Sequence, residues 1–136
     1  MPSRESRGYT DVATYKMVVL SNAVAGREEE CDHWYCSKHL HDVTVLPGFV
    51  SAQRFSLAHR LEEKNPYQFM AIYEIESDDL SKILSGLVSA AETGELEVSS
   101  ALDSANAYAV VYSATGEPVR DLSSLYQSAS SRSESL

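Results

Sequence analysis

The pattern of apolar and polar residues predicts four β-strands along this chain. Residues 15–22 have largely apolar side chains on both faces, which is typical of a central strand covered on two sides. Residues 67–75 and 107–112 are rich in aromatic and β-branched residues, which favour strands. The longest run, residues 49–59, alternates so that Phe49, Ser51, Gln53, Phe55 and Leu57 share one face and Val50, Ala52, Arg54, Ser56 and Ala58 share the other.

Two further segments have the pattern of helices. Three acidic residues, Glu28–Glu30, follow Gly26, and negative charge favours a helix N-terminus. This first helix is predicted to run to about His39, because Pro47 and Gly48 interrupt the chain before the next strand. The second helix is predicted to follow a cap at residues 77–79 and to end at Gly94, with apolar residues at helical intervals: Leu80, Ile83, Leu84, Leu87, Val88 and Ala91.

The resulting order, β-α-β-β-α-β, predicts an α+β ferredoxin-like protomer. Its four-stranded antiparallel sheet carries two helices on one face. Since the other face also needs cover, we expect a homodimer in which two sheets meet back to back as a dimeric α/β barrel. The predicted organisation is a flexible N-terminus at residues 1–13, the barrel domain at 14–114 and a Ser-rich C-terminal tail at 115–136.

Composition narrows the classes of function. The chain has 136 residues, 43% of them hydrophobic, which is enough for one modest core. Its net charge of -9, with no basic cluster, argues against binding to nucleic acid. No apolar run approaches the roughly 20 residues of a membrane span, and the first residues lack the apolar centre of a signal peptide. The chain is therefore expected in the cytoplasm and away from membranes.

The junction between the first helix and the second strand holds the candidate catalytic residues. Asp32, Tyr35 and His39 are spaced by three and four residues, so one helix face can carry all three side chains. His39 is the predicted general base or acid, because the unperturbed pKa of about 6.5 lets an imidazole exchange protons near neutrality. Asp42 is predicted to orient His39 or hold its charge, and Tyr35 to donate a hydrogen bond to a developing oxyanion. A helical His can equally be a surface or satisfied core residue.

The predicted substrate-binding residues surround this junction. Trp34 can wall an apolar pocket, although it can also be an ordinary core residue. Arg54 can anchor a carboxylate or phenolate if its side chain points between sheet and helices, or it can form a cross-strand salt bridge. Tyr73 belongs to a group of strand tyrosines that suit either an aromatic substrate or a dimer interface. Phe49 and His41 complete the predicted set.

Neither a metal nor a cofactor is predicted. His33, His39, His41, Asp32 and Asp42 are a dense set of possible ligands. However, His33 lies about 120° around an α-helix from His39, so a closed coordination shell is hard to build. Cys31 and Cys36 are about 140° apart on the same helix, which excludes a disulfide between them there.

The stretch EEECDHWYCSKHLHDVTVLPGFVSAQRF resembles the helix-to-strand region of the EthD-like and related dimeric α/β-barrel proteins. In those proteins a W-Y pair, a His at the helix end, an Asp-Val and a Pro-Gly-Phe lead into the second strand, and the strand order agrees over roughly residues 14–113. The resemblance implies that His39 is the helix-end histidine, with Trp34, Tyr35 and Asp42 around it. His41 departs from similar sequences, which often have Pro there.

Members of that superfamily include cofactor-free isomerases, cyclases, lyases and monooxygenases of aromatic or polyketide-like compounds, together with haem-degrading enzymes. The favoured hypothesis is a small cofactor-independent lyase or isomerase with a His-centred acid/base site, acting on a small apolar or aromatic compound in aromatic-compound catabolism or polyketide-like metabolism. One alternative is a non-catalytic hydrophobic-metabolite-binding or accessory protein. A further alternative is a cofactor-free or haem-linked monooxygenase.

Overall fold

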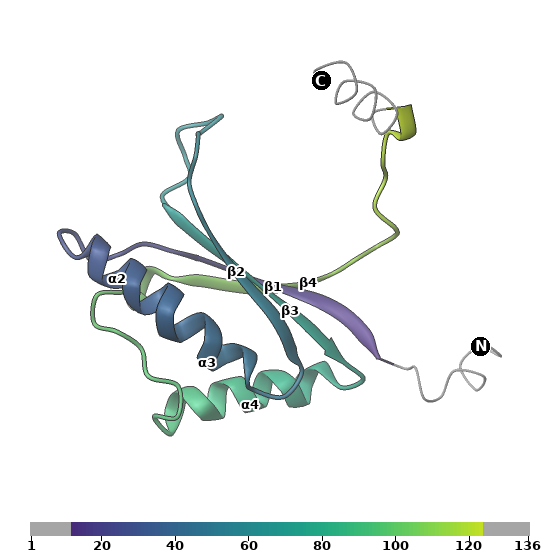
Figure 1. Ribbon diagram of the computed structural model, residues 1–136, viewed down its shortest axis with the longest axis horizontal. Helices are drawn as coiled ribbons and strands as arrows, with labels where there is room; N and C mark the ends of the chain where they lie inside the picture. The colour runs from purple at the N-terminus through teal and green to yellow at the C-terminus, as the bar shows by residue number, and fades with distance from the viewer. Residues whose placement is uncertain (1–11, 124–136) are drawn as a thin grey trace, which may run out of the picture.

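A four-stranded antiparallel sheet with helices on one face organises residues 12–123, the part of the chain that the computed structural model describes (Figure 1). The strands, in the order β2-β3-β1-β4 across the sheet, are β1 (Ala13–Ser21), β2 (Phe49–Ser56), β3 (Phe69–Ser77) and β4 (Tyr108–Ser113). The helical elements are α2 (Glu28–Trp34), the π-helix η2 (Tyr35–His39), α3 (Leu40–Thr44), α4 (Leu80–Glu92) and the short η3 (Ser104–Asn106). The predicted ferredoxin-like protomer is confirmed.

Several predicted boundaries move. The first helical segment continues past His39 to Thr44, through η2 and α3. The second strand ends at Ser56 rather than at His59, because its pairing with β3 stops where Ser56 meets Phe69. The predicted flexible segment 1–13 and Ser-rich tail 115–136 lie mostly outside the described residues.

The helix α4 follows its sequence signals closely. The Asp79 side chain caps it by accepting a hydrogen bond from the Lys82 backbone N–H at 3.2 Å. Gly94 adopts a positive φ just after the helix. Ile83 and Ala90 are buried on its inner face, whereas Val88, which the pattern placed among the apolar positions, is exposed.

A β-bulge reverses one face assignment in β2. The register shifts between Phe49 and Ser51, so Phe49 pairs with Ile75 while Ala52 pairs with Tyr73 and Arg54 with Ala71. Phe49 therefore lies on the helix side of the sheet together with Arg54. Simple alternation had put these two residues on opposite faces, and that expectation was wrong.

The core lies between the sheet and the helices. Met17, Ala71, Tyr73 and Ile75 point from the central strands towards Tyr35, Val43 and Ile83 on the helices. β1 has neighbours on both sides, β3 and β4, which confirms its predicted central position. The other face of the sheet carries partly or fully exposed apolar side chains, among them Val18, Leu20, Phe55, Met70, Ile72, Tyr108, Val110 and Tyr112.

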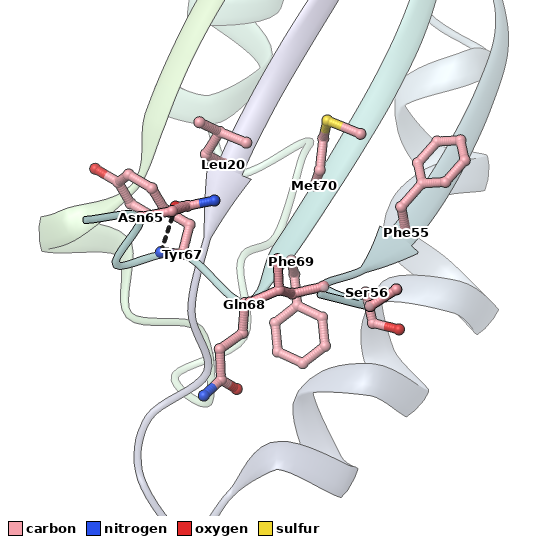
Figure 2. A pocket seen from close by; sticks show the side chains of 10 residues that line it. Leu20, Phe55, Ser56, Asn65, Tyr67, Gln68, Phe69 and Met70 are labelled. Atoms are coloured by element: carbon pink, nitrogen blue, oxygen red, sulfur yellow. Dashed lines mark hydrogen bonds between the residues drawn. The ribbon is translucent and has the colours of Figure 1, made fainter. Parts of the chain in front are cut away.

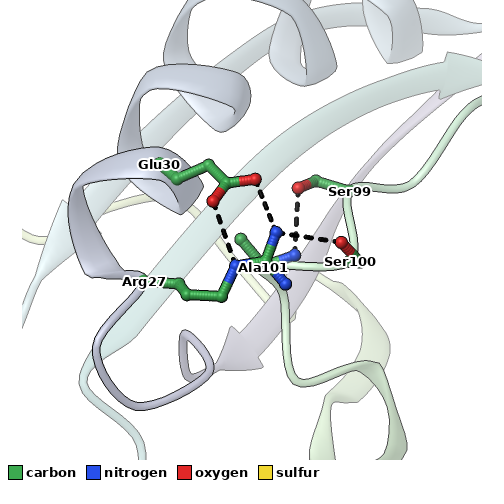
Figure 3. A network of polar contacts seen from close by, with 5 residues as sticks. All are labelled: Arg27, Glu30, Ser99, Ser100 and Ala101. Carbon is green, nitrogen blue, oxygen red and sulfur yellow. Dashed lines mark hydrogen bonds and ion pairs between the residues drawn. The ribbon is translucent and has the colours of Figure 1, made fainter.

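Hydrogen bonds connect the start of α2 to the loop that follows α4 (Figure 3). Arg27 donates to Glu30 through Nε at 3.0 Å and Nη2 at 2.6 Å, and Nη2 also donates to Ser100 Oγ at 3.0 Å. The Val24 backbone N–H donates to the Ala101 carbonyl at 2.7 Å. An exposed ion pair of this kind contributes little stability by itself, so the backbone hydrogen bond is expected to contribute more to this contact.

No helix among residues 12–123 is long and apolar enough to cross a membrane.

Candidate active site

A π-helical turn at Tyr35–His39 builds the candidate active site. The Leu40 backbone N–H donates to the Tyr35 carbonyl, an i→i+5 hydrogen bond in place of the usual i→i+4 bond. In an α-helix, residues five apart point about 140° away from each other. The wider turn instead brings Trp34 and His39 onto the same face. Such turns are frequent at functional sites.

His39 is enclosed by two aromatic rings. The Trp34 ring stacks on the imidazole, with centroids 4.5 Å apart and planes 26° apart. The Tyr35 ring meets the imidazole edge to face at 5.0 Å, and the Trp34 and Tyr35 rings contact each other at 5.2 Å. Tyr35 is buried, while Trp34 and His39 are half-buried. The structure therefore brings these three predicted site residues together.

Burial lowers the pKa of His39 from its ordinary 6.5 to about 4; the nearby Asp42 carboxylate opposes the shift, and Lys38 adds to it. The imidazole is therefore neutral at pH 7. Its Nδ1 atom is buried and has no hydrogen-bond partner among the described residues. The pKa of His39 is therefore lower than the unperturbed value expected from the sequence.

Asp42 and His41 lie at the margin of this cluster. The Asp42 carboxylate accepts a hydrogen bond from Lys38 Nζ at 2.7 Å, one helical turn earlier. The negative charge of Asp42 raises the pKa of His39 and so opposes the effect of burial. The His41 side chain is exposed on α3. The roles predicted for these two residues stay predictions.

Two phenols meet beneath the aromatic cluster. The Tyr73 hydroxyl of β3 donates to the Tyr35 hydroxyl at 3.3 Å, and both side chains are buried. The Phe49 ring packs edge to face on Tyr73 with centroids 6.3 Å apart. Burial raises the pKa of both tyrosines, so both stay protonated at neutral pH and can donate a hydrogen bond.

Arg54 completes the cluster from β2. Its guanidinium lies 4.7 Å from the centroid of the Tyr35 ring and 4.0 Å from that of Phe69. Nη1 donates to Asp32 Oδ1 of α2 at 2.5 Å. The Arg54 side chain points between sheet and helices, the condition on which its predicted role as an anchor depends. Its salt bridge runs to a helix rather than across the strands.

A cavity of about 320 Å³ lies at the end of the β2–β3 pair (Figure 2). Phe69 is among its lining residues, but the Phe69 ring packs on Arg54 on the helix side of the sheet, whereas Leu20, Phe55 and Met70 line the cavity from the open face. The other lining residues are Leu20, Phe55, Ser56, Leu57, Ala58, Asn65, Tyr67, Gln68 and Met70. None of the five principal cavities within residues 12–123 is lined by His39.

The sequence did not predict one contact and one residue of the cluster. Asp32 and Arg54 were both candidates, but they are 22 positions apart in the chain and their ion pair was not predicted. Phe69 gave no signal beyond its strand propensity. Its role depends on the pairing of β2 with β3, which sets Phe69 opposite Ser56.

Comparisons with solved structures identify the fold. A protein from Arabidopsis thaliana is 14% identical, with a TM-score of 0.57 over 77% of this chain and 99% of that one. An EthD-like protein from Ralstonia eutropha JMP134 is 15% identical, with a TM-score of 0.52 over 78% and 96%. A DABB family protein with a ferredoxin-like fold from Mesorhizobium loti is 8% identical, with a TM-score of 0.52 over 76% and 99%.

No family model and no curated protein matches the chain. At sequence identities this low, structural similarity shows the fold of the protomer and does not show its reaction. The likeness confirms that this chain has a ferredoxin-like fold, which it shares with the EthD-like protein and the DABB family protein.

Proposed function

We propose that this chain is a small cofactor-independent enzyme in which His39 moves a proton on a small apolar or aromatic substrate. The reaction is an isomerisation, a cyclisation or a carbon-carbon lyase step. The observation that carries the proposal is the neutral imidazole, held by Trp34 and Tyr35 at a π-helical turn, whose buried Nδ1 has no partner among the described residues.

The low pKa of His39 determines how it works. A neutral imidazole has one nitrogen that donates and one that accepts. With a pKa of about 4, His39 is a weak base as long as no anion lies beside the ring. An anion that develops on a substrate beside the ring raises that pKa, because it stabilises the imidazolium. Proton transfer is thereby coupled to formation of the substrate anion.

The neighbouring side chains assist this step. Tyr35 and Tyr73 are protonated phenols that can donate to an oxyanion once a substrate replaces their mutual hydrogen bond. Trp34 covers one face of the imidazole and excludes water. Asp42, although paired with Lys38, favours the imidazolium through its charge. His41 is given no role in the step, because its side chain is exposed.

We also propose that two copies of the chain pair through the open face of the sheet. Apolar side chains, including Val18, Ile72 and Val110, form a continuous row across β3, β1 and β4 on that face. Burying such a surface is favourable, and a second copy offers a matching one. The dimer would leave the helix side, and so His39, unobstructed.

A non-catalytic metabolite-binding protein is the second candidate. The observation that favours it is the same low pKa, since a group that is uncharged throughout the neutral range can serve as a hydrogen-bonding partner without exchanging protons. A monooxygenase is distinguished from both by consumption of oxygen.

The test is a mass-spectrometric screen of purified protein against small aromatic and polyketide-like compounds, without added cofactor. It compares the wild type with His39→Ala and with His41→Ala, a matched loss of an exposed imidazole two positions away. Conversion lost only in His39→Ala supports the enzyme. Binding without conversion in all three proteins supports the metabolite-binding role. Conversion that survives His39→Ala contradicts the proposal.

A further inference from the structure

Arg54 has hydrogen-bonding capacity that the described structure does not use. Its side chain is 8% exposed, yet only Nη1 has a partner, the Asp32 carboxylate. Nε and Nη2 are both buried and donate to no acceptor among residues 12–123. A buried cationic donor without an acceptor is costly, so such a group calls for an explanation.

The two unused nitrogens are a matched pair. In a planar guanidinium, the N–H bond of Nε and one N–H bond of Nη2 are parallel and lie on the same edge. That edge binds both oxygens of a carboxylate at once, through two parallel hydrogen bonds. Asp32 uses the opposite end of the group and leaves this edge open.

Aromatic rings hold the guanidinium in place. Phe69 lies against it at 4.0 Å and Tyr35 at 4.7 Å, measured from Cζ to the ring centroids. Such packing fixes the orientation of the group before any ligand arrives, which lowers the entropic cost of binding. It also restricts hydrogen bonding to the edges of the guanidinium.

The open edge belongs to the same cluster as His39. The Tyr35 ring contacts both groups, the Arg54 guanidinium at 4.7 Å and the His39 imidazole at 5.0 Å. Phe69 provides the second ring against the guanidinium, at 4.0 Å. An aromatic acid whose carboxylate binds the open edge of Arg54 would hold its ring close to these aromatic side chains.

We propose that Arg54 binds a carboxylate of the ligand, so that the substrate class is a small aromatic carboxylic acid. The Asp32 side chain is 49% exposed and keeps its contact with Nη1 at the opposite end of the guanidinium. As a statement about the substrate, the proposal rests on the proposed function. As a statement about binding, it holds for an enzyme and a metabolite-binding protein alike.

The test titrates the protein with sodium benzoate at constant ionic strength and follows the fluorescence of Trp34, the single tryptophan of the chain. Benzamide, which has the same ring without the charge, is titrated in parallel. Benzoate is expected to produce a saturable change, and benzamide at most a much weaker one. Isothermal titration calorimetry provides an independent affinity for both compounds.

Three variants locate the site. Arg54→Lys keeps the charge but loses the paired edge, and it is expected to weaken benzoate binding by about tenfold or more. Asp32→Asn removes a neighbouring negative charge that repels the ligand carboxylate while keeping Arg54, and it is expected to tighten binding. Arg120→Gln, at an exposed position, is the control for a lost cation and should leave the affinity unchanged.

Equal responses to benzoate and benzamide would overturn the proposal, as would an affinity that Arg54→Lys does not change. Its failure is distinct from failure of the proposed function. Benzoate binding that needs Arg54, without any conversion that needs His39, keeps this site and removes the enzyme. Conversion of uncharged compounds alone, with no benzoate binding, keeps the enzyme and removes the Arg54 site.

Discussion

Trp34 and His39 stack with ring centroids 4.5 Å apart although they are five residues apart in a helix. The contact exists because η2 inserts an i→i+5 turn between α2 and α3. It places an imidazole in aromatic surroundings, where burial lowers its pKa to about 4. Local backbone geometry thus determines the protonation state of the candidate catalytic residue.

The pKa of His39 predicts a specific loss of stability in acid. Between pH 6.5 and about 4, the unfolded chain binds a proton at this residue that the folded chain does not. The free energy of unfolding is therefore highest above pH 6.5 and falls as the pH drops towards 4. His39→Gln, which cannot titrate, should reduce this fall by on the order of 2 kcal/mol. Urea denaturation across the pH range measures it.

His41→Gln is the matched control, because His41 is exposed on the same helical segment. It should follow the pH profile of the wild type. Identical profiles for the wild type and His39→Gln would show that the imidazole titrates near its ordinary value and is not held neutral by burial.

The hydrogen bond between Tyr35 and Tyr73 predicts non-additive mutations. Tyr73→Phe leaves the Tyr35 hydroxyl buried without this partner, and Tyr35→Phe does the same to Tyr73. Each single change should lower the free energy of unfolding by roughly 1–2 kcal/mol. The double variant should cost clearly less than the two single costs combined. Strictly additive costs, measured by chemical denaturation, would mean that the 3.3 Å contact contributes no coupling.

Gly48 should tolerate no side chain. Its φ is +89°, and a Cβ atom there would lie 2.5 Å from Ile83 Cδ1 of α4. Gly48→Ala should therefore lower the free energy of unfolding by roughly 2 kcal/mol or more, through backbone strain and overpacking.

Gly86→Ala is the contrasting substitution. Gly86 lies within α4, and a Cβ atom there meets nothing within 4 Å. Alanine should stabilise the helix by roughly 0.5–1 kcal/mol. Thermal unfolding of both variants checks the pair, and a Gly48→Ala protein as stable as Gly86→Ala would contradict the packing described for the turn before β2.

The proposed dimer predicts that a charge on the open sheet face separates the subunits. Ile72 lies on that face between Val18 and Gln53 of the neighbouring strands. The wild type should sediment at twice the 15.0 kDa mass of the chain, and Ile72→Asp at that mass. Val88→Asp, on the exposed side of α4, is the control and should remain dimeric. A wild type that sediments as a monomer at micromolar concentration would contradict the dimer.

The sequence predicts the fold from local signals. The cap at Asp79, the apolar repeat in α4 and Gly94 define one helix, and the apolar faces of residues 15–22 define the central strand. The β2 bulge has no such signal, because an extra residue leaves the alternation in the sequence unchanged while it reverses the face of Phe49. The π-helix is missed for the same reason, since the argument assumed α-helical spacing.

The sequence predicted which residues form the candidate site better than it predicted their contacts and protonation states. His39, Tyr35, Trp34, Arg54 and Tyr73 do come together. Their partners depend on contacts between distant segments, such as Arg54 with Asp32, and on burial, which changes the pKa of His39. Neither is encoded in spacing along the chain.

Proton transfer by His39 is tested most directly by deuterium exchange. The compound that is bound or converted in the screen is incubated in D₂O with the wild type, His39→Ala or His41→Ala, and its mass is followed over time. The wild type and His41→Ala should incorporate solvent deuterium into the compound, and His39→Ala should not. Equal incorporation with His39→Ala would contradict proton transfer by this residue.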